Sequence, residues 1–446
     1  MRRSSLFGHV AELIDLVVSA HQPADNTVRE YFRQRHYLGS HDRRFIAEYL
    51  YGTLRHYTRL QILFDQTISN VREGIRLKRA PGIGLCATYA LHVVGEEAAS
   101  LEPDIAGLWR TATPDIDPSV LLRSLQTAVL PKEILADPVR RIATEYSMPG
   151  SVVEEWVDRF GAQEAERLCQ ASNEPAPTTL RVNTLRCTVD ECHDTLTAAG
   201  VESRRAVLAP HGLVLGKRMF AEGIRAFKEG FFEIQDEGSQ LISLLTRAQP
   251  GQNIVDACAG AGGKTLHLGA LMKNSGALLA MDTTPERLKN LRLRASRAGV
   301  TIIREVVVGD RQPPPEDWIG TADALLIDAP CSGIGTFRRN PGAKLLFSET
   351  FVSAVSRTQS EILDRHSSLL KPGGNLVYST CTMLRRENEQ IIDQFLQMHR
   401  NYEVCSAPEI LRRQGVSIVE PGHFLLLLPH RHGTDGFFAA VLKKLA

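Results

Sequence analysis

The sequence predicts a multidomain fold: an all-α N-terminal domain, a small α+β domain and a C-terminal α/β domain with a parallel sheet. Its 446 residues are too many for one ordinary hydrophobic core. Helical periodicity dominates the N-terminal part, whereas from residue 251 apolar strands alternate with amphipathic helices, the pattern of a parallel α/β sheet. A turn-rich, proline-containing stretch ends the first helical part. We therefore place the domains at residues 1–135, 136–235 and 236–446.

The N-terminal domain is predicted to be helical and locally basic. Gly39 and Ser40 break one helix, and Asp42 is the expected cap of the next. The apolar residues of that next segment fall on one helical stripe; they are Phe45, Ile46, Leu50, Leu54 and Leu60. Few acidic residues balance the arginines nearby, so we expect phosphate contact here and not only solvated helix faces. These arginines are Arg29, Arg33, Arg35, Arg43, Arg44, Arg55 and Arg59.

The composition describes a soluble globular chain. Hydrophobic residues make up 43% and the net charge is +1, so any nucleic-acid surface must be a local patch. No apolar run approaches the roughly 20 residues that a membrane helix needs. Near the start, Glu12 and Asp15 interrupt the apolar residues at helical spacing, which favours an amphipathic helix over a signal peptide and leaves a mitochondrial presequence as an alternative. We expect a cytoplasmic monomer.

Eight cysteines are scattered along the chain without framework spacing, which indicates a reducing compartment. Cys187, Cys192 and His193 have the spacing of half a zinc site, but no second Cys/His pair follows. We therefore interpret them as residues of a helix that is capped near Thr188, and we expect no metal. The small α+β domain is completed by short strands, including "TTLRVNTL" and "GFFEIQDEGSQL".

A glycine-rich turn follows the first strand of the C-terminal domain. The stretch "NIVDACAGAGGKTLHLGALM" reads as an apolar strand, a turn and a helix. Gly260, Gly262 and Gly263 let the backbone approach a ligand, and the first N–H groups of the helix are free to meet it. The spacing is not that of a P-loop and only loosely that of a dinucleotide fingerprint, so the turn alone is weak evidence.

Three successive strands of this domain each end in an aspartate, namely Asp282, Asp310 and Asp328. The carboxyl ends of parallel strands meet at one edge of a sheet, where ligands bind, and Asp282 stands where an acid meets ribose hydroxyls. No nicotinamide-binding half follows, which indicates S-adenosylmethionine as the nucleoside ligand and a Rossmann-like methyltransferase fold. Such a fold ends in an antiparallel pair, and "HFLLLLPHRHGTDGFFAAVLKK" supplies two strands around a turn.

Two cysteines, Cys331 and Cys381, follow the fourth and fifth strands at this same edge, and each precedes a pair of arginines. A thiolate that adds to carbon 6 of a pyrimidine turns carbon 5 into a nucleophile that can accept a methyl group. An ordinary thiol is mostly protonated at neutral pH, so positive neighbours would assist it. Either cysteine alone is more often a buried structural residue. Both at one edge favour the catalytic interpretation.

The motifs "DACAGAGGKT", "AMD", "VVGD", "LIDAPCSGIGTFRRNP" and "VYSTCT", in this order, resemble the RsmB/Sun/nucleolar-protein family of RNA cytosine-5 methyltransferases. The stretch "PTTLRVNTL" resembles the preceding domain of that family, and "GSHDRRFIAEYLYGTLRH" resembles the NusB-like helical domain of its bacterial RsmB members. The resemblance covers nearly the whole chain. It implies a class I methyltransferase domain, S-adenosylmethionine as cofactor, and 5-methylcytosine formation in RNA, with small-subunit (16S) ribosomal RNA as substrate.

The resemblance also implies roles for matching residues. Cys381 matches the nucleophile and Cys331 the cysteine that assists product release. Asp328 matches the acid that holds the polar edge of cytosine, and Lys264 matches the lysine that closes the glycine loop. Arg181 is a loose match to an RNA phosphate contact. The implied cofactor contacts are Cys258, Ala259, Gly260, Ala261, Gly262, Gly263, Lys264, Asp282, Asp310 and Asp328.

The chain departs from the family pattern twice. Gly260-Ala261 stands where the family usually has alanine-proline, which predicts a more flexible turn with the same path. After "RRNP", the residues Gly342 to Leu345 replace Asp-x-Lys-Trp, which puts a local RNA contact in doubt.

Four alternatives remain beside the RNA cytosine-5 interpretation. The first is a 5-methylcytosine methyltransferase that acts on a tRNA or another RNA. The second is a DNA cytosine-5 methyltransferase with Cys331 as its nucleophile. The third is an amino-group methyltransferase, which would carry Pro-Pro-aromatic after the acid instead of Ala329-Pro330-Cys331. The fourth is an inactive NusB-like RNA-binding scaffold.

Overall fold

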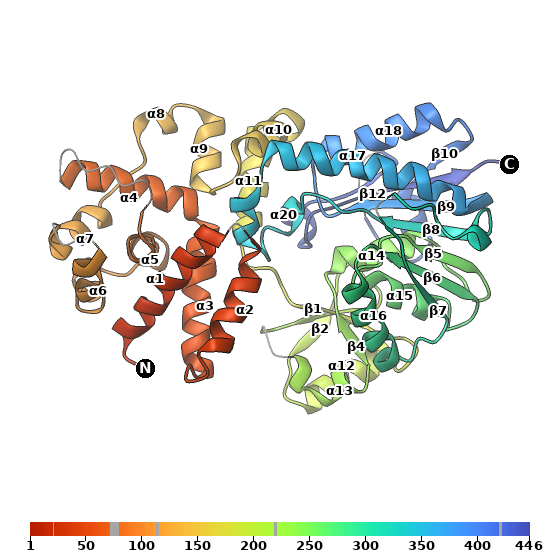
Figure 1. Ribbon diagram of the computed structural model, residues 1–446, viewed down its shortest axis with the longest axis horizontal. Coiled ribbons are helices and arrows are strands. Elements are labelled where there is room, and N and C mark those ends of the chain that lie inside the picture. Colours follow the sequence, from red (N-terminus) through yellow and green to blue (C-terminus); the bar gives the residue numbers. More distant parts are fainter. Residues whose placement is uncertain (21, 72–79, 113–115, 218–220, 310, 419–421) are drawn as a thin grey trace. The chain divides into compact units, whose positions relative to one another are not determined.

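The computed structural model describes residues 1–20, 22–71, 80–112, 116–217, 221–309, 311–418 and 422–446 (Figure 1). The chain forms two compact units. The first contains Met1–Pro175 and Phe337–Phe347, and the second contains Ala176–Thr336 and Ser348–Ala446. The boundary at residue 175 falls inside the predicted domain 136–235, so the division into three domains stays a prediction.

The first unit is helical, as the sequence predicts. Its helices are α1 (Arg3–Ala20), α2 (Ala24–Gln34), α3 (Ser40–Arg55), α4 (Tyr57–Val71), α5 (Gly82–Tyr89), α6 (Ala98–Ala112), α7 (Pro118–Gln126), α8 (Lys132–Leu135), α9 (Pro138–Glu145), α10 (Gly150–Phe160) and α11 (Ala162–Asn173). No helix among the described residues is long and apolar enough to cross a membrane.

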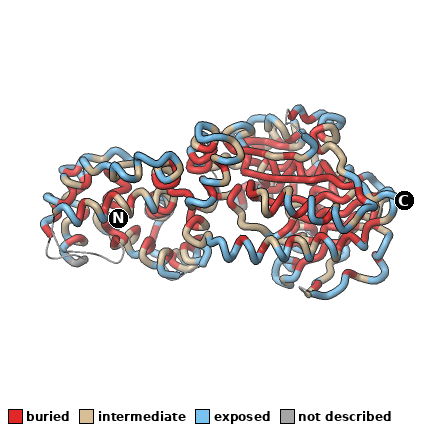
Figure 2. Tube along the Cα trace, turned by 90° about the horizontal axis from the view of Figure 1, so that it is seen from above, coloured by how far each residue is buried: buried red, intermediate tan, exposed pale blue. Residues whose placement is uncertain are grey.

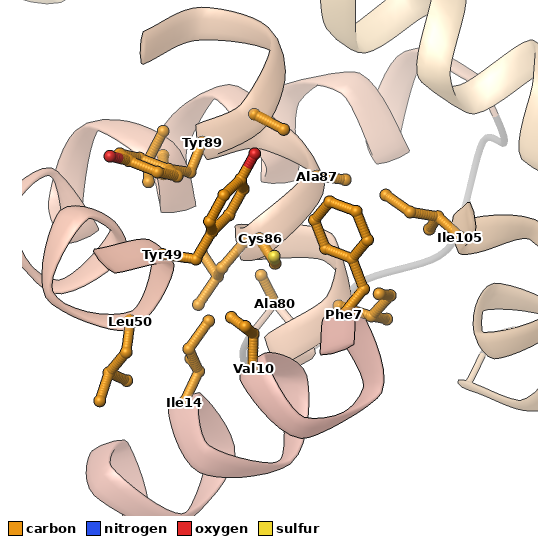
Figure 3. Packing of buried hydrophobic residues seen from close by; sticks show 14 of the residues in the cluster. Phe7, Val10, Ile14, Tyr49, Leu50, Ala80, Cys86, Ala87, Tyr89 and Ile105 are labelled. Atoms are coloured by element: carbon orange, nitrogen blue, oxygen red, sulfur yellow. The ribbon is translucent and has the colours of Figure 1, made fainter. Parts of the chain in front are cut away.

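The core of this unit is formed by the apolar stripes of α1, α3, α4 and α5. Phe7 meets Tyr49 edge to face with ring centroids 5.3 Å apart, and Tyr49 meets Tyr89 in the same way at 5.5 Å. Figure 3 shows these rings beside the buried thiol of Cys86. Ile46 and the other residues of its stripe that the sequence predicted as apolar contacts belong to this core.

The start of α3 differs from the expectation. Gly39 is the residue before the helix, and Asp42 is its third residue, where the carboxylate accepts the Gly39 N–H at 3.2 Å. Asp42 therefore supports the helix start from inside the first turn, because the first N–H groups of any helix lack intrahelical partners.

Internal partners engage several of the arginines that were expected to contact phosphate. Arg33 pairs with Glu30 at 2.5 Å, and Arg35 pairs with Glu12 at 2.6 Å. Arg43 donates to the Leu38 carbonyl at 2.9 Å. Arg29 and Arg44 are exposed. For these two exposed arginines, phosphate contact stays a prediction.

The segment Phe337–Phe347, which follows the loop of Cys331, belongs to the helical unit. Its Lys344 is 8% exposed, and its ammonium donates to the carbonyl oxygens of Arg55 (3.0 Å) and Tyr146 (3.1 Å) and to the side-chain oxygen of Asn173. These acceptors lie at the C-terminal ends of α3, α9 and α11, where carbonyl groups lack helical donors. Lys344 is thus a buried structural lysine and is not placed to contact RNA.

The second unit begins with a small antiparallel sheet in the order β2-β3-β1-β4, with helix α12 (Val189–Ala198). Its strands are β1 (Thr179–Val182), β2 (Ser203–Arg205), β3 (Gly212–Leu215) and β4 (Phe232–Ile234). Helix α12 begins after Thr188, whose hydroxyl accepts the Glu191 N–H at 3.2 Å, which confirms the predicted cap. The predicted α+β element is therefore present.

The second sheet of this unit has eight strands, with the order β10-β12-β9-β8-β5-β6-β7 and β11 paired with β12. Strands β5 to β9 run parallel, and β12 runs antiparallel to β9, β10 and β11. The strands are β5 (Asn253–Asp256), β6 (Ala277–Asp282), β7 (Ile303–Val307), β8 (Ala322–Asp328), β9 (Leu370–Thr380), β10 (Tyr402–Cys405), β11 (Leu425–Leu427) and β12 (Phe437–Lys444). The predicted parallel sheet with a terminal antiparallel pair is confirmed.

Helices cover both faces of this sheet, because successive strand residues point to opposite faces. On β8, Leu326 packs with α14, α15 and α19, whereas Leu325 and Ile327 pack with α17 and α18. In Figure 2 the strands run as buried tubes between partly exposed helices. The helices of this part of the unit are α14 (Glu237–Leu245), α15 (Gly263–Leu271), α16 (Pro285–Ala298), α17 (Glu349–His366), α18 (Glu389–Met398) and α19 (Ala407–Arg412).

Candidate active site

The glycine turn leads from the carboxyl end of β5 into α15, beside the point where the strand order reverses between β5 and β8. Gly260 and Gly262 have φ of 55° and 88°, the left-handed region that favours glycine. A Cβ on Gly262 would lie 2.7 Å from Leu291 of α16, whereas a Cβ on Gly260 would meet nothing within 4 Å. The turn is thus tightly packed at Gly262 and open at Gly260.

Asp282, at the end of β6, stabilises this turn through hydrogen bonds. Its carboxylate accepts the N–H of Gly260 at 2.9 Å and the N–H of Thr284 at 2.8 Å. The side chain is buried, and each carboxylate oxygen keeps further acceptor capacity for a ligand hydroxyl. Asp282 therefore couples the predicted ribose site to the shape of the glycine turn.

A second buried acid near the turn, Asp256, was missed from the sequence. It ends β5 and accepts the Thr265 hydroxyl at 2.7 Å. Burial raises the pKa of Asp256 to about 6. Its position at the end of the first strand, directly before the glycine motif, was the available signal.

Lys264 and Asp328 form an ion pair at the end of β8. The Lys264 ammonium lies 2.6 Å from Asp328 Oδ2, and the Ser379 hydroxyl donates to Asp328 Oδ1 at 3.0 Å. Burial by itself would lower the pKa of Lys264, but the neighbouring Asp328 carboxylate outweighs it and the pKa is raised. The structure therefore brings together the predicted lysine and acid, with the lysine fully charged.

The two thiols lie side by side. Cys331 follows β8 and Cys381 follows β9, and the two sulfur atoms are 3.3 Å apart, a contact and not a disulfide bond. Adjacent parallel strands produce this proximity, because Asp328 is paired with Ser379 in the sheet register. The hydrogen bond to Cys381, and then burial, raise the pKa of Cys331 well above its ordinary value. Cys331 is therefore a neutral thiol, and either sulfur atom can donate in the contact between them.

The structure shows a positive neighbour of Cys381 that does not come from the two arginine pairs. Arg386 pairs with Glu349, and Arg338 belongs to the other unit. Lys264 is a cation that interacts electrostatically with Cys381. The residues around Cys381 could not indicate this pairing, because Lys264 is more than one hundred residues away along the chain.

Arg181 is also not where the loose family match placed it. It is 2% exposed and donates to the side chain of Gln235 and to the carbonyl of Gly263. Burial lowers its pKa to about 9. Arg181 supports the start of α15 through this hydrogen bond to Gly263, and because it is buried it is not available to an RNA phosphate. Asp310 lies outside the described residues.

Of the remaining predicted cofactor contacts, Cys258 to Gly262 lie in the turn between β5 and α15, and Gly263 is the first residue of α15. Burial and neighbouring acids raise the pKa of Cys258, which is therefore a neutral thiol. Three further polar residues were missed: Gln359, Glu387 and Asn388 are fully buried, and they contact the neighbours of the two thiols. The last two stand in the stretch "RRENE" that follows Cys381.

These residues fit S-adenosylmethionine. The open side of Gly260 leaves room for a ligand at the strand ends, and the N-terminus of α15 directs N–H groups there. Asp282 offers carboxylate oxygens of the kind that accept ribose hydroxyls. These hydrogen-bond donors and acceptors thus match a nucleoside that carries a polar substituent, as S-adenosylmethionine does.

Comparison with known families agrees with this site. A sequence model described as "16S rRNA methyltransferase RsmB/F" matches residues 243–443, and one described as "Methyltr_RsmF/B-like, ferredoxin-like domain" matches residues 148–221. The chain is 37% identical over 326 residues to the probable ribosomal RNA small subunit methyltransferase B of Bacillus subtilis, covering 73% of this chain and 72% of that protein. It is 32% identical to the protein of the same description from Synechocystis, covering 92% of this chain and 93% of that protein.

Solved structures show the same fold. The crystal structure titled PH0851 superimposes with a TM-score of 0.78 at 26% identity, covering 100% of this chain and 99% of that one. A methyltransferase homolog protein from Pyrococcus horikoshii superimposes with a TM-score of 0.58 at 26% identity, covering 71% of this chain and 100% of that one. Fold, matched models and relatives of nearly full length agree, and the chain therefore belongs to the RsmB/F family of 16S rRNA methyltransferases, whose cofactor is S-adenosylmethionine.

Proposed function

We propose that this protein forms 5-methylcytosine in small-subunit ribosomal RNA, with Cys381 as the attacking thiolate and Cys331 as the group that assists release. The observation that carries the proposal is the 3.3 Å contact between the two sulfur atoms at the ends of adjacent strands. An amino-group methyltransferase needs no thiol at this place, and an inactive scaffold needs no charged Lys264 beside it. The choice of ribosomal RNA follows the relatives, which are described as small subunit methyltransferases.

The first step makes carbon 5, which is a poor nucleophile in free cytosine, reactive toward a methyl group. The Cys381 sulfur forms a bond to carbon 6, and the electron pair of the double bond between carbons 5 and 6 moves so that carbon 5 becomes an enamine-type nucleophile. The cofactor supplies an electrophilic methyl group, which carbon 5 accepts. Lys264 supplies a positive charge that interacts with the Cys381 sulfur before attack.

The second step restores the aromatic base. The proton on carbon 5 passes to a base, its bonding electrons re-form the double bond, and Cys381 leaves carbon 6 as a thiolate. Cys331 suits the role of base by its position, because its sulfur lies 3.3 Å from the sulfur that bonds carbon 6. In this step Cys331 passes its own proton to solvent and then accepts the one from carbon 5. One proton is released for each methyl group transferred.

Asp328 is placed to hold the base. Its side chain is about one third exposed, while Lys264 and Ser379 fix its orientation. A carboxylate at this edge accepts a hydrogen bond from the exocyclic amino group of cytosine, which uracil lacks. The lysine therefore acts twice, on the acid that binds the base and on the thiol that attacks it.

We also propose that residues 1–135 form a NusB-like RNA-binding domain and that the ferredoxin-like part within residues 136–235 adds to the RNA surface. Exposed Arg29 and Arg44 support the first assignment, because they can contact phosphates without breaking an internal ion pair. The target cytosine must leave any base stack to reach the sheet edge, which favours a loop or an exposed end of the RNA.

The experiment compares Cys381→Ala and Cys331→Ala on a denaturing gel with a small-subunit ribosomal RNA fragment and cofactor. Cys381→Ala should give neither methylated product nor adduct, whereas Cys331→Ala should give a protein–RNA complex that survives denaturation. An adduct from Cys381→Ala with none from Cys331→Ala would reverse the roles, as in the DNA-type alternative. Bisulfite sequencing of total RNA from a strain that lacks the gene then identifies the cytosine, and loss of methylation only in a tRNA would refute the ribosomal substrate.

A further inference from the structure

Glu387 and Asn388 are consecutive, fully buried polar residues between β9 and α18. Burying a carboxylate or an amide is costly unless hydrogen bonds compensate for the lost water. Their partners therefore show what the fold uses them for. The carbonyl of Glu387 accepts the Tyr378 hydroxyl at 2.7 Å, which fixes this pair of residues to β9.

Glu387 supports the loop that carries Cys331. Its carboxylate accepts the Ser332 N–H at 2.8 Å and the Ser332 hydroxyl at 2.5 Å. The Gln359 amide donates to the same carboxylate at 3.1 Å and to the Pro330 carbonyl at 2.8 Å. Both chain neighbours of Cys331 are thus tied to the Glu387–Gln359 pair.

Asn388 supports the loop that carries Cys381 in the same manner. Its side-chain oxygen accepts the Thr380 hydroxyl at 2.6 Å, and its side-chain nitrogen donates to the Thr382 carbonyl at 3.0 Å. The hydroxyls of Ser332 and Thr382, 3.0 Å apart, connect the two loops. Both chain neighbours of Cys381 are therefore held by one amide.

From these contacts we infer that Glu387 and Asn388 are positioning residues for the two thiols, Glu387 for the releasing Cys331 and Asn388 for the attacking Cys381. Glu387 and Asn388 are joined by one peptide bond, so the loops that they hold, and with them the two sulfur atoms, are kept at a defined separation. This inference rests on the proposed roles of the thiols. A purely structural role for the pair makes a different prediction, namely that every variant loses stability and both chemical steps together.

Isosteric variants distinguish these roles. Gln in place of Glu387 can keep an oxygen toward the Ser332 N–H and the Gln359 amide, while its nitrogen donates to the Ser332 hydroxyl, which can turn to Thr382. Asp in place of Asn388 cannot keep both contacts, because a second carboxylate oxygen would face the Thr382 carbonyl. We therefore use Glu387→Gln as the conservative control, Glu387→Ala as the disruptive variant, and Asn388→Asp as an isosteric but disruptive variant.

The experiment measures single-turnover adduct formation and methylated-product release with the full-length protein, S-adenosylmethionine and the small-subunit ribosomal RNA fragment. Glu387→Ala should form the adduct at nearly the wild-type rate and slow release about 100-fold, the scale expected when a reacting group is misplaced by about an ångström. Asn388→Asp should slow adduct formation about 100-fold without accumulating adduct. Glu387→Gln should stay close to the wild type in both steps.

Calorimetric binding of S-adenosylmethionine shows whether each variant is folded. If Glu387→Ala does not bind the cofactor, Gln359→Met replaces it, because that change removes the donor to Pro330 and must also accumulate adduct. Equal loss of both steps in all disruptive variants, or wild-type behaviour of Asn388→Asp, would overturn the inference. If Cys331→Ala traps adduct while Glu387→Ala and Gln359→Met do not, the inference fails and the proposed function stands. If Cys331→Ala itself traps none, both fail.

Discussion

Gly262 of the cofactor turn should be far less tolerant of alanine than Gly260, two residues before it. Both residues have positive φ, so alanine at either costs about 1–2 kcal/mol of backbone strain, partly offset by a less flexible unfolded chain. Only at Gly262 would the new Cβ meet a packed side chain, with Leu291 Cδ1 at 2.7 Å and Leu291 Cγ at 2.8 Å. Real Cβ atoms do not approach this closely, so the Leu291 side chain or α16 itself must shift.

Overpacking of this kind adds about 1–3 kcal/mol, which brings the total for Gly262→Ala to roughly 2–5 kcal/mol. For a domain of this size, the melting temperature falls by about 2–4 °C per kcal/mol. Gly262→Ala should therefore lower the melting transition of the methyltransferase unit by roughly 5–15 °C, whereas Gly260→Ala should lower it by only a few degrees.

Differential scanning calorimetry of the full-length variants measures both shifts, and isothermal titration with S-adenosylmethionine follows the turn itself. Gly260→Ala is the matched control, because the family usually has alanine at this position. Equal shifts for the two variants would refute the reasoning, since they would mean that contact with Leu291 contributes nothing. A smaller effect at Gly262 than at Gly260 would show that the turn packs differently.

Three further outcomes are expected. Asp282→Ala should weaken S-adenosylmethionine binding in calorimetry, because the Gly260 and Thr284 N–H groups lose their acceptor along with the ribose; unchanged affinity would remove Asp282 from the site. Burial lowers the pKa of Lys344 to about 7, so between pH 7 and 10.5 the unfolded chain binds a proton that the folded chain does not. The free energy of unfolding of the wild type, measured in urea relative to Lys344→Met, should therefore rise with pH across this window. A difference that does not change with pH would contradict the burial of Lys344. RNA affinity should fall steeply with salt in filter binding, and removing residues 1–135 should weaken it; undiminished affinity would leave the helical domain without an RNA role.

The sequence determined which residues share the edge of the sheet. A strand that ends in a given residue presents it at the carboxyl edge, so the positions of Asp282, Asp328, Cys331 and Cys381 along the chain were sufficient to predict one site. The alternation of strands and helices likewise predicted a parallel sheet, because periodicity reports which residues of an element are buried. Both conclusions depend only on local spacing.

The tertiary structure decided which of these residues touch one another and what surrounds them. The strand order places β8 next to β9, and only this pairing brings the two sulfur atoms to 3.3 Å. The same long-range contacts bury Arg181 under the glycine turn, assign Lys344 to the helical unit and give Glu387 and Asn388 their partners. Local periodicity carries no signal for such pairs, because the energy of a buried polar group depends on donors and acceptors that come from distant parts of the chain.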